Sequence, residues 1–146
     1  MVILLVEDDP LIAMSLEATV FDAGHIVRGP ASTAARALEM VDQGQLPDLG
    51  LVDINLRDGN GAGVGLAREL LSRWCIPSFF VSAQNREARA NRDAALGLIT
   101  KPYSPKTILK SIDLAQQLMQ GMRIDLSTVP PGIEMFSGKS SGGSHA

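Results

Sequence analysis

The sequence predicts an α/β fold, a doubly wound parallel sheet of five strands in the order 2-1-3-4-5, and two observations carry this prediction. Five short apolar segments alternate with five helical segments over about 120 of the 146 residues. Such alternation is typical of parallel sheets, because each helix carries the chain back to start the next strand. The segments 2–6 and 49–52 are continuously apolar, as in strands buried on both faces. Right-handed crossovers then place the first and third strands side by side.

The expected strands are apolar, rich in β-branched residues at the start of the chain, and bounded by turn-forming residues. They span residues 2–6, 25–28, 49–52, 78–82 and 97–100. The helices between them begin at capping residues. Asp9-Pro10 and Ser104-Pro105 each combine an N-cap side chain with a proline suited to the first helical turn. The helices are expected over residues 10–23, 33–43, 64–74, 84–95 and 105–119.

Acidic side chains follow two strands that this fold makes neighbours. Glu7 and Asp8 come directly after the first strand, and Asp53 comes at the end of the third. The carboxyl ends of these strands meet at the edge where open α/β sheets bind ligands. Three carboxylates gathered there repel one another unless a cation neutralises them or a proton is shared. Such oxygen ligands suit Mg²⁺, with Mn²⁺ as a second candidate, although Asp53 taken alone would equally fit a turn.

Two further polar residues lie at the same predicted edge. Ser82 ends the fourth strand and Lys101 follows the fifth. A lysine there could bind a carboxylate or a phosphoryl oxygen as a point charge, and a serine hydroxyl could donate to a phosphoryl oxygen. Taken alone, Ser82 is better explained as a helix N-cap and Lys101 as a surface lysine. The combination at four strand ends is more specific than either residue.

Composition narrows the class of protein. The net charge is −3 and the 13 basic residues are spread thinly, so no nucleic-acid partner is expected. Cys75 is the single cysteine, and no apolar run approaches the ~20 residues of a membrane span. We therefore expect a cytoplasmic protein with one domain over residues 1–121. Residues 122–146, rich in glycine, proline and serine, are expected to form a flexible tail without an effector domain.

Over residues 1–121 the chain resembles the receiver domains of two-component response regulators, of the stand-alone single-domain type. The resemblance rests on four motifs in the family's order: Leu5-Val6-Glu7-Asp8-Asp9-Pro10, Val52-Asp53-Ile54-Asn55-Leu56, Phe80-Val81-Ser82-Ala83 and Thr100-Lys101-Pro102-Tyr103. It implies a flavodoxin-like receiver fold and a place in a phosphorelay. It also implies a signalling module rather than an enzyme.

The resemblance further implies a role for each residue at the strand ends. Asp53 would be the phosphoacceptor, supplied by a histidine kinase or a histidine phosphotransfer protein. Ser82 would be the switch hydroxyl and Lys101 the phosphoryl-binding lysine. The implied ligands of Mg²⁺ are three carboxylates and one peptide oxygen: Glu7, Asp8, Asp53 and the backbone carbonyl of Asn55.

The fourth helix, fifth strand and fifth helix are the expected binding surface for a downstream protein. Arg86, Arg89 and Arg92 recur at three-residue spacing on the fourth helix and could meet an acidic partner. A solvated helix face explains the same spacing. Met119 and Met122 could serve a homodimer or a partner contact, and core packing would also account for them.

Two alternatives remain open at this point. Leu98 stands three residues before the lysine, where many family members carry an aromatic residue that rotates on activation. A degenerate receiver that binds proteins without phosphorylation is therefore one alternative. The other is a haloacid-dehalogenase-type phosphatase, which needs an acid-base Asp two residues after the nucleophile. Asn55 occupies that position and cannot transfer the proton.

Overall fold

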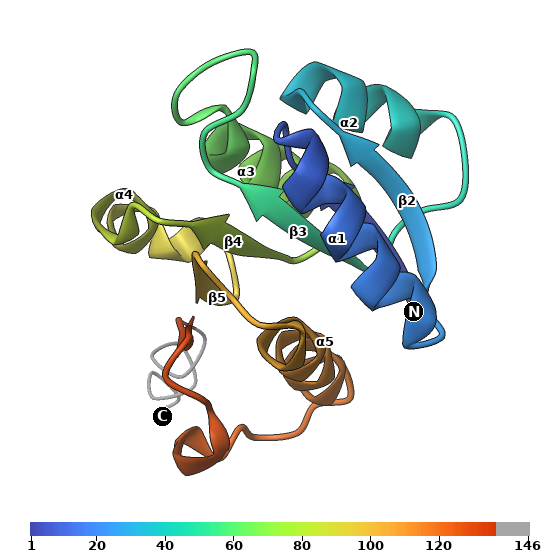
Figure 1. Ribbon diagram of the computed structural model, residues 1–146. Coiled ribbons are helices and arrows are strands. Elements are labelled where there is room, and N and C mark those ends of the chain that lie inside the picture. The colour runs from blue at the N-terminus through green and yellow to red at the C-terminus, as the bar shows by residue number, and fades with distance from the viewer. Residues whose placement is uncertain (137–146) are drawn as a thin grey trace.

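A six-stranded sheet with helices on both faces forms the protein, in a computed structural model that describes residues 1–136 (Figure 1). The first five strands are parallel and follow the predicted order 2-1-3-4-5, so the predicted fold class is confirmed. A sixth strand is added antiparallel at the β5 edge. Across the sheet the strands are β2 (Ile26–Ala31), β1 (Val2–Val6), β3 (Leu49–Asp53), β4 (Ser78–Ser82), β5 (Gly97–Thr100) and β6 (Ile133–Met135).

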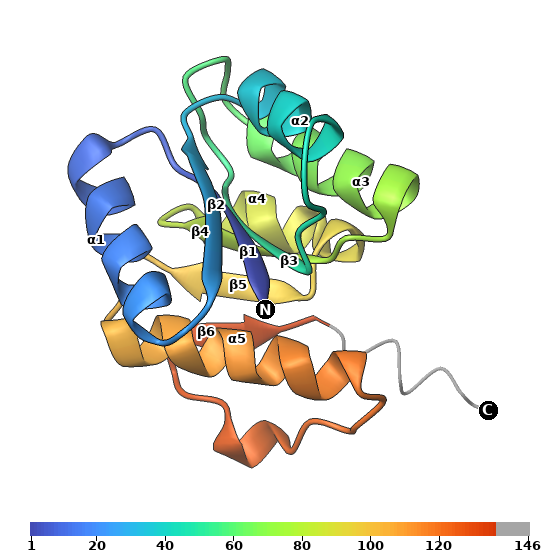
Figure 2. The same ribbon diagram turned by 90° about the vertical axis from the view of Figure 1, so that its right-hand side faces the viewer.

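The helices form two layers, one on each face of the sheet (Figure 2). One layer consists of α1 (Pro10–Asp22) and α5 (Pro105–Met119). The other consists of α2 (Ala34–Asp42), α3 (Ala62–Trp74) and α4 (Asn85–Ala90), followed by the short 3-10 helix η1 (Arg92–Ala94). A second 3-10 helix, η2 (Leu126–Thr128), lies between α5 and β6. Among residues 1–136, no helix has the length and apolar character needed to cross a membrane.

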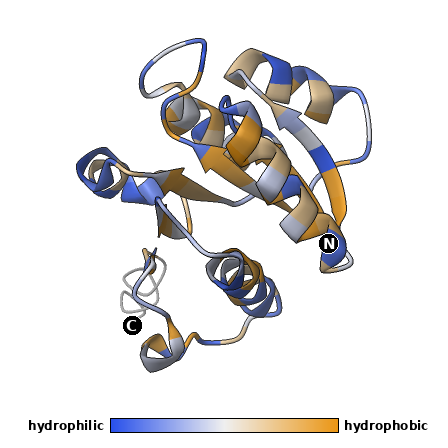
Figure 3. Cartoon of the chain, in the orientation of Figure 1, coloured by the Kyte–Doolittle hydropathy of each residue, from blue (hydrophilic) through white to orange (hydrophobic). Residues whose placement is uncertain are grey.

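The central strands are apolar on both faces because both faces are covered. On β1, Ile3 and Leu5 pack toward α1 and α5, whereas Leu4 and Val6 pack toward α2 and α3. All four side chains are buried. Figure 3 shows the result as hydrophobic strands in the middle of the molecule and hydrophilic residues on α4. The continuous apolar pattern of segment 2–6 thus has the structural cause expected for a central parallel strand.

Two helix starts follow the capping chemistry of the sequence. The Asp9 carboxylate accepts hydrogen bonds from the N–H groups of Leu11 at 2.9 Å and Ile12 at 3.2 Å. The Ser104 hydroxyl accepts from the N–H of Thr107 at 3.2 Å and caps α5. Each side chain satisfies a backbone donor that has no partner within the first helical turn.

The fourth helix is shorter than predicted. A single helix over 84–95 was expected from its alanine and arginine content, but α4 ends at Ala90 and only a 3-10 turn follows. Asn91 separates the two, with φ −121° and ψ 36°. Its side-chain amide donates to the carbonyl of Glu87 at 3.0 Å, which satisfies one carbonyl of the last helical turn. Helix propensity alone does not maintain so short a segment, so tertiary contacts decide where it ends.

The expectation of a flexible tail from residue 122 is wrong for the part that the structure describes. Residues 133–135 form β6, which pairs Ile133 with Ile99, Glu134 with Leu98 and Met135 with Gly97. Without β6, the N–H and C=O groups on that side of β5 would form an open sheet edge, which proteins commonly cover. Residues 137–146 of the expected tail lie outside the described residues.

The expectation of three arginines facing a partner from α4 also needs correction. Arg89 forms an ion pair with Glu134 of β6, with 2.8 Å between Nη2 and Oε1. Arg92 lies over the ring of Phe136, with its guanidinium carbon 5.2 Å from the ring centroid. Two residues of the predicted tail, Glu134 and Phe136, therefore engage two of the three arginines.

Candidate functional site

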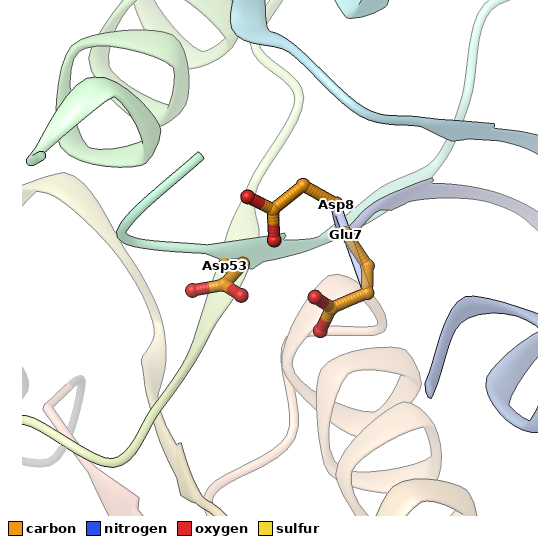
Figure 4. Close-up of side chains that lie close together, drawn as sticks. All are labelled: Glu7, Asp8 and Asp53. Carbon is orange, nitrogen blue, oxygen red and sulfur yellow. The ribbon is translucent and has the colours of Figure 1, made fainter. Parts of the chain in front are cut away.

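Three carboxylates converge at the carboxyl edge of the sheet, where β1 and β3 end. β1 and β3 are hydrogen-bonded neighbours, with Val6 paired to Val52, so the residues that follow them emerge side by side. Figure 4 shows Glu7 and Asp8 coming from the end of β1 and Asp53 from β3. One oxygen from each carboxylate lies within 4.8 Å of the other two. Glu7 is 4% exposed and Asp53 is 7% exposed, so this negative charge lies largely out of water.

Lys101 reaches the same site from the end of β5. Its Nζ lies 2.8 Å from Oδ2 of Asp53 and 2.9 Å from Oε1 of Glu7. The peptide bond between Lys101 and Pro102 is cis. Three ionised carboxylates and one ammonium leave two negative charges uncompensated, which a divalent cation would neutralise. Oxygen ligands with partial access to water fit Mg²⁺, so the residues present suit this ion.

Burial and hydrogen bonding act in opposite directions on the ionisable groups of the site. Burial raises the pKa of Glu7 above its ordinary value of 4.5, against the hydrogen bonds from Asp9 and Lys101 that lower it. Burial by itself would lower the pKa of Lys101. The hydrogen bonds to Asp53 and Glu7 outweigh burial, so the pKa of Lys101 is raised above 10.5. The lysine is therefore charged at neutral pH and Glu7 holds a proton more readily than an ordinary glutamate.

Asn55 anchors the loop after β3 beneath Asp53. Its N–H donates to Oδ1 of Asp53 at 3.1 Å. Its side-chain oxygen accepts from the N–H of Gly61 at 2.9 Å, and its amide nitrogen donates to Oε1 of Gln84 at 3.1 Å. The Asn55 side chain thus ties the loop after β3 to the loop after β4, and its peptide carbonyl is the group left to serve as the implied ion ligand.

Ser82 lies at the same edge, and its hydroxyl is engaged locally. The hydroxyl accepts from the N–H of Gln84 at 2.8 Å, which is a turn contact and not an N-cap of α4. Val81 pairs with Asp53, so Ser82 follows directly beside the acid. The carbonyl of Ser82 accepts from the N–H of Lys101 at 3.0 Å, which joins the two strand ends. The structure thus gathers the predicted residues at one edge, with the Ser82 hydroxyl directed to its own loop.

The sequence did not single out two residues that shape the site. Gln84 bridges Asn55 and Ser82, and its position two residues after the β4 tip was the available signal. Gly63 lies in the first turn of α3, and a Cβ built there would be 1.9 Å from the carbonyl oxygen of Asp53. Only glycine lets α3 approach the Asp53 backbone this closely.

An apolar groove opens beside the lysine, with a volume of about 430 Å³. Residues of α1 and of the loops after β4 and β5 line it: Leu11, Ile12, Ser15, Ala83, Pro102 and Tyr103. The Tyr103 hydroxyl is buried without a hydrogen-bond partner, and burial raises the pKa of Tyr103 above 10.0. The groove thus places an apolar surface next to Lys101, which contacts the acids.

Comparison with known proteins identifies the family. The model of the response regulator receiver domain matches residues 3–113. The chain belongs to this family. The phyllosphere-induced regulator PhyR of Methylorubrum extorquens is 37% identical over 122 residues, which are 83% of this chain and 45% of that protein. The receiver thus spans about half the length of this curated relative.

Solved structures agree in fold. The response regulator PhyR from Brucella abortus superposes with a TM-score of 0.72 at 27% identity, over 99% of this chain and 53% of that one. The receiver domain of NtrX from Brucella abortus gives a TM-score of 0.71 at 26% identity, over 79% of this chain and 98% of that one. Receiver domains are typically signalling modules of two-component systems rather than enzymes. They bind Mg²⁺ through acidic residues, and they interact with histidine kinases or phosphotransfer proteins and with downstream targets.

Proposed function

We propose that this receiver accepts a phosphoryl group on Asp53 in a Mg²⁺-dependent reaction and passes the signal on through protein contacts. One observation carries the proposal. Asp53 is a buried strand-end carboxylate bonded to Lys101 and lies within ion-binding distance of Glu7 and Asp8. A nucleophile, a fixed cation and a divalent-ion site at one point are the components that phosphoryl transfer requires.

The chemistry would be an in-line displacement at phosphorus. An oxygen of the Asp53 carboxylate attacks the phosphorus of a phosphohistidine, and the bond from phosphorus to the imidazole nitrogen breaks. The electron pair leaves with the imidazole, and an acyl phosphate remains on Asp53. The Lys101 ammonium donates a hydrogen bond to Oδ2 of Asp53 in the unphosphorylated protein. After transfer it would donate to a phosphoryl oxygen, where the negative charge then lies. Mg²⁺, held by Glu7, Asp8 and Asp53 with the Asn55 carbonyl, would supply the remaining positive charge.

The switch would act through the loop after β4. The Ser82 hydroxyl now accepts from Gln84, and a phosphoryl oxygen on the neighbouring strand end offers it a charged acceptor. Turning toward that acceptor removes the turn contact and releases Gln84, which also bonds Asn55. A local charge change would thus shift a loop with two arrangements.

The phosphodonor protein, a histidine kinase or histidine phosphotransfer protein, would dock on α1 beside the apolar groove. Leu11 is 77% exposed, Met14 65% and Phe21 68%, and they lie along one side of the helix. Exposed apolar side chains gathered on one element mark interaction surfaces. The groove brings this surface to the edge of the phosphoryl site, so a docked helix bundle could present its histidine there. Met119, the last residue of α5, and Met122, three residues further on, are both about half exposed and would be available for a homodimer contact.

Acetyl phosphate with Mg²⁺ provides the test. We expect intact-mass analysis to show one added phosphoryl group on the wild type and none on Asp53→Asn. Chelation of Mg²⁺ should abolish the uptake, while circular dichroism shows an unchanged fold. Asp58→Asn is a matched control, because Asp58 follows the same strand but caps α2 through the N–H groups of Ala34 and Ala35. Uptake by Asp53→Asn, or uptake without a divalent ion, would contradict the proposal.

One observation favours phosphorylation-independent binding as a second candidate function. Leu98 is fully buried, pairs with Glu134 of β6, and packs in the same core cluster as Phe80 and Phe136. As a leucine, it offers no aromatic ring that could rotate inward on activation. Partner binding that is equal for the wild type and Asp53→Ala, with and without acetyl phosphate, would select this candidate. The phosphatase alternative gains no such support, because the Asn55 amide is occupied by Gln84 and Gly61.

A further inference from the structure

β6 and the residue after it place alternate side chains on opposite faces of the sheet. Ile133 and Met135 pack into the core cluster beneath α1 and α5, and Ile133 is 5% exposed. Glu134 and Phe136 face the other way, toward α4 and η1. The segment therefore engages both layers through four residues, as a strand bound at a sheet edge does.

The α4 side holds an acidic and an aromatic side chain at fixed spacing. The Nε of Arg89 donates to both carboxylate oxygens of Glu134, at 2.9 and 3.1 Å, and Nη2 approaches Oε1 at 2.8 Å. Two residues on, Phe136 is 3% exposed and packs with Ala88, Ala94 and Leu98. The Arg92 guanidinium covers its ring. This face thus selects an acid and, two positions later, an aromatic ring.

The backbone of β5 completes the site. Beyond the ladder itself, the N–H of Thr100 donates to the carbonyl of Gly132 at 3.0 Å, and the N–H of Phe136 donates to the carbonyl of Leu96 at 2.8 Å. A Cβ at Gly97 would lie 2.4 Å from the carbonyl oxygen of Glu134. A glycine at this position therefore makes room for an added strand to approach closely. Thr100 directly precedes Lys101, so the strand-binding edge and the phosphoryl site share one strand end.

β6 lies beyond the part of the chain that the family model matches, which ends at residue 113, and beyond α5, which ends at Met119. The surface it covers is formed by α4, β5 and α5, which was expected from the sequence to meet a downstream protein. A cationic helix beside a sheet edge complements an extended acidic segment. β6 and the residue after it show which side chains fit this surface: an acid on Arg89 and an aromatic ring under Arg92.

We propose that the β5 edge with Arg89 and Arg92 is a binding site for an extended segment of a partner protein, one that carries an acidic residue followed two positions later by an aromatic residue. β6 is the intramolecular occupant of this site and competes with the partner. The proposal deepens the output half of the proposed function and rests on it. A partner segment would replace the β6 ladder and place its acid on Arg89 and its ring under Arg92.

The test measures binding of a labelled peptide with the sequence of residues 130–136, Pro-Pro-Gly-Ile-Glu-Met-Phe, to the full chain by fluorescence anisotropy. The double variant E134R/F136A loosens β6 by removing both side-chain contacts on the α4 side. We expect it to bind the peptide at least 10-fold more tightly than the wild type, because the internal competitor is weakened. The single variant E134R, whose fold rests on unchanged apolar packing, should show a smaller gain of about 3-fold.

Substitution of Arg89 tests whether the peptide binds at the β5 edge. Adding R89A to E134R/F136A removes the cation without recreating an ion pair to β6, and it should weaken binding of the native peptide about 3-fold while leaving binding of a peptide with Glu134→Ala unchanged. Glu69→Arg, which breaks the Arg73–Glu69 pair on α3, is the matched control and should bind the peptide as the wild type does. Circular dichroism verifies that each variant is folded.

Three results would overturn the proposal. One is a folded E134R that binds the peptide no better than the wild type, and another is native-peptide binding that R89A leaves unchanged. The third is a loosened variant that forms dimers by sedimentation and excludes the peptide, which would assign the edge to a second copy of this chain. No phosphodonor or Mg²⁺ is present in these titrations, so their failure is distinct from a failure of Asp53 to take up a phosphoryl group.

Discussion

Glu7 and Asp53 are two buried carboxylates that share one ammonium group. Lys101 has a side chain that is 20% exposed and contacts both acids at hydrogen-bond distance. The pairing compensates for the desolvation of the acids, which would otherwise be a large penalty because both are largely shielded from water. It also keeps a cation at the point where a phosphoryl group would develop negative charge. The same contacts therefore serve folding and chemistry.

Removal of the Lys101 ammonium should affect both the stability of the fold and the rate of phosphoryl uptake. We expect Lys101→Met to lower the free energy of unfolding by about 3 kcal/mol without Mg²⁺, because two buried acids lose their partner. Saturating Mg²⁺ should restore part of the loss, and phosphoryl uptake should slow by about 100-fold. Urea unfolding and intact-mass kinetics measure the two effects. Lys110→Met, which removes an exposed pair with Asp113, should change neither, and equal losses in both variants would contradict the assignment.

The raised pKa of Glu7 predicts how Mg²⁺ binding depends on pH. A proton competes with the ion for this carboxylate, so affinity should fall as pH falls, beginning at a higher pH than for a glutamate with the ordinary value of 4.5. Calorimetry in buffers of different ionisation enthalpy should detect proton release on binding. Glu7→Gln should abolish that release and weaken binding at least about tenfold, whereas the exposed Glu39→Gln should leave both unchanged. Proton release that persists in Glu7→Gln would assign the proton to another group.

At the scale of single elements, α3 is held against β3 at one glycine. Gly63 faces the backbone of Asp53 and Ile54, and its N–H donates to the carbonyl of Ile54 at 2.8 Å. Gly65 lies on the same helix and has nothing within 4 Å of a built Cβ. The two positions differ in contact and not in helix propensity, so they form a matched pair.

Substitution of each by alanine should have opposite effects. Gly63→Ala should lower the free energy of unfolding by about 3 kcal/mol, because the helix must move away from the strand end. Phosphoryl uptake should slow as well, since Asp53 lies on that strand. Gly65→Ala should raise the free energy of unfolding by about 0.5–1 kcal/mol through the lower entropy of the unfolded chain. Urea unfolding measures both, and destabilisation by Gly65→Ala would show that the helix and not the contact is sensitive.

At the scale of the whole molecule, β6 makes residues beyond the receiver module part of its core. Phe136 and Ile133 are buried in the clusters that α3, α4 and α5 complete. Both layers of helices thus contact a strand that lies beyond residues 3–113, the part of the chain that the family model matches. The last described residues contribute to the stability of the sheet as well as covering its edge.

Apolar burial should hold β6 in place more than its ion pair does. We expect Phe136→Ala to lower the free energy of unfolding by about 3 kcal/mol, the usual effect of removing a buried phenylalanine ring. Glu134→Ala should lower it little, because Arg89 and Glu134 are both partly exposed. Hydrogen exchange at the Phe136 and Thr100 amides should quicken in the first variant. Equal destabilisation by both substitutions would show that the Arg89–Glu134 ion pair stabilises β6 as much as the burial of Phe136 does.

The sequence predicted the structure best where a continuous apolar run required a strand buried on both faces. The apolar runs of β1 and β3 indicated central strands, and central strands bring Glu7, Asp8 and Asp53 to one edge whatever the loops do. Sequence reasoning failed at α4 and β6. The composition around α4 favours helix up to Ala95, but packing of Ala94 and the turn at Asn91 end it early. Residues 133–135 form too short a strand, after two prolines and a glycine, to show a period.

By itself the sequence determined which strands are central, the order in which they pair, and the residues that stand at their carboxyl ends. These follow from hydrophobic pattern and handedness, which act along the chain and leave few topologies. Only the tertiary structure decided that Lys101 bonds two acids at once, that the Ser82 hydroxyl turns to Gln84, and that Glu134 and Phe136 occupy the α4 surface. Contacts between residues far apart in sequence depend on the exact packing of side chains in three dimensions. The local hydrophobic pattern does not encode that packing.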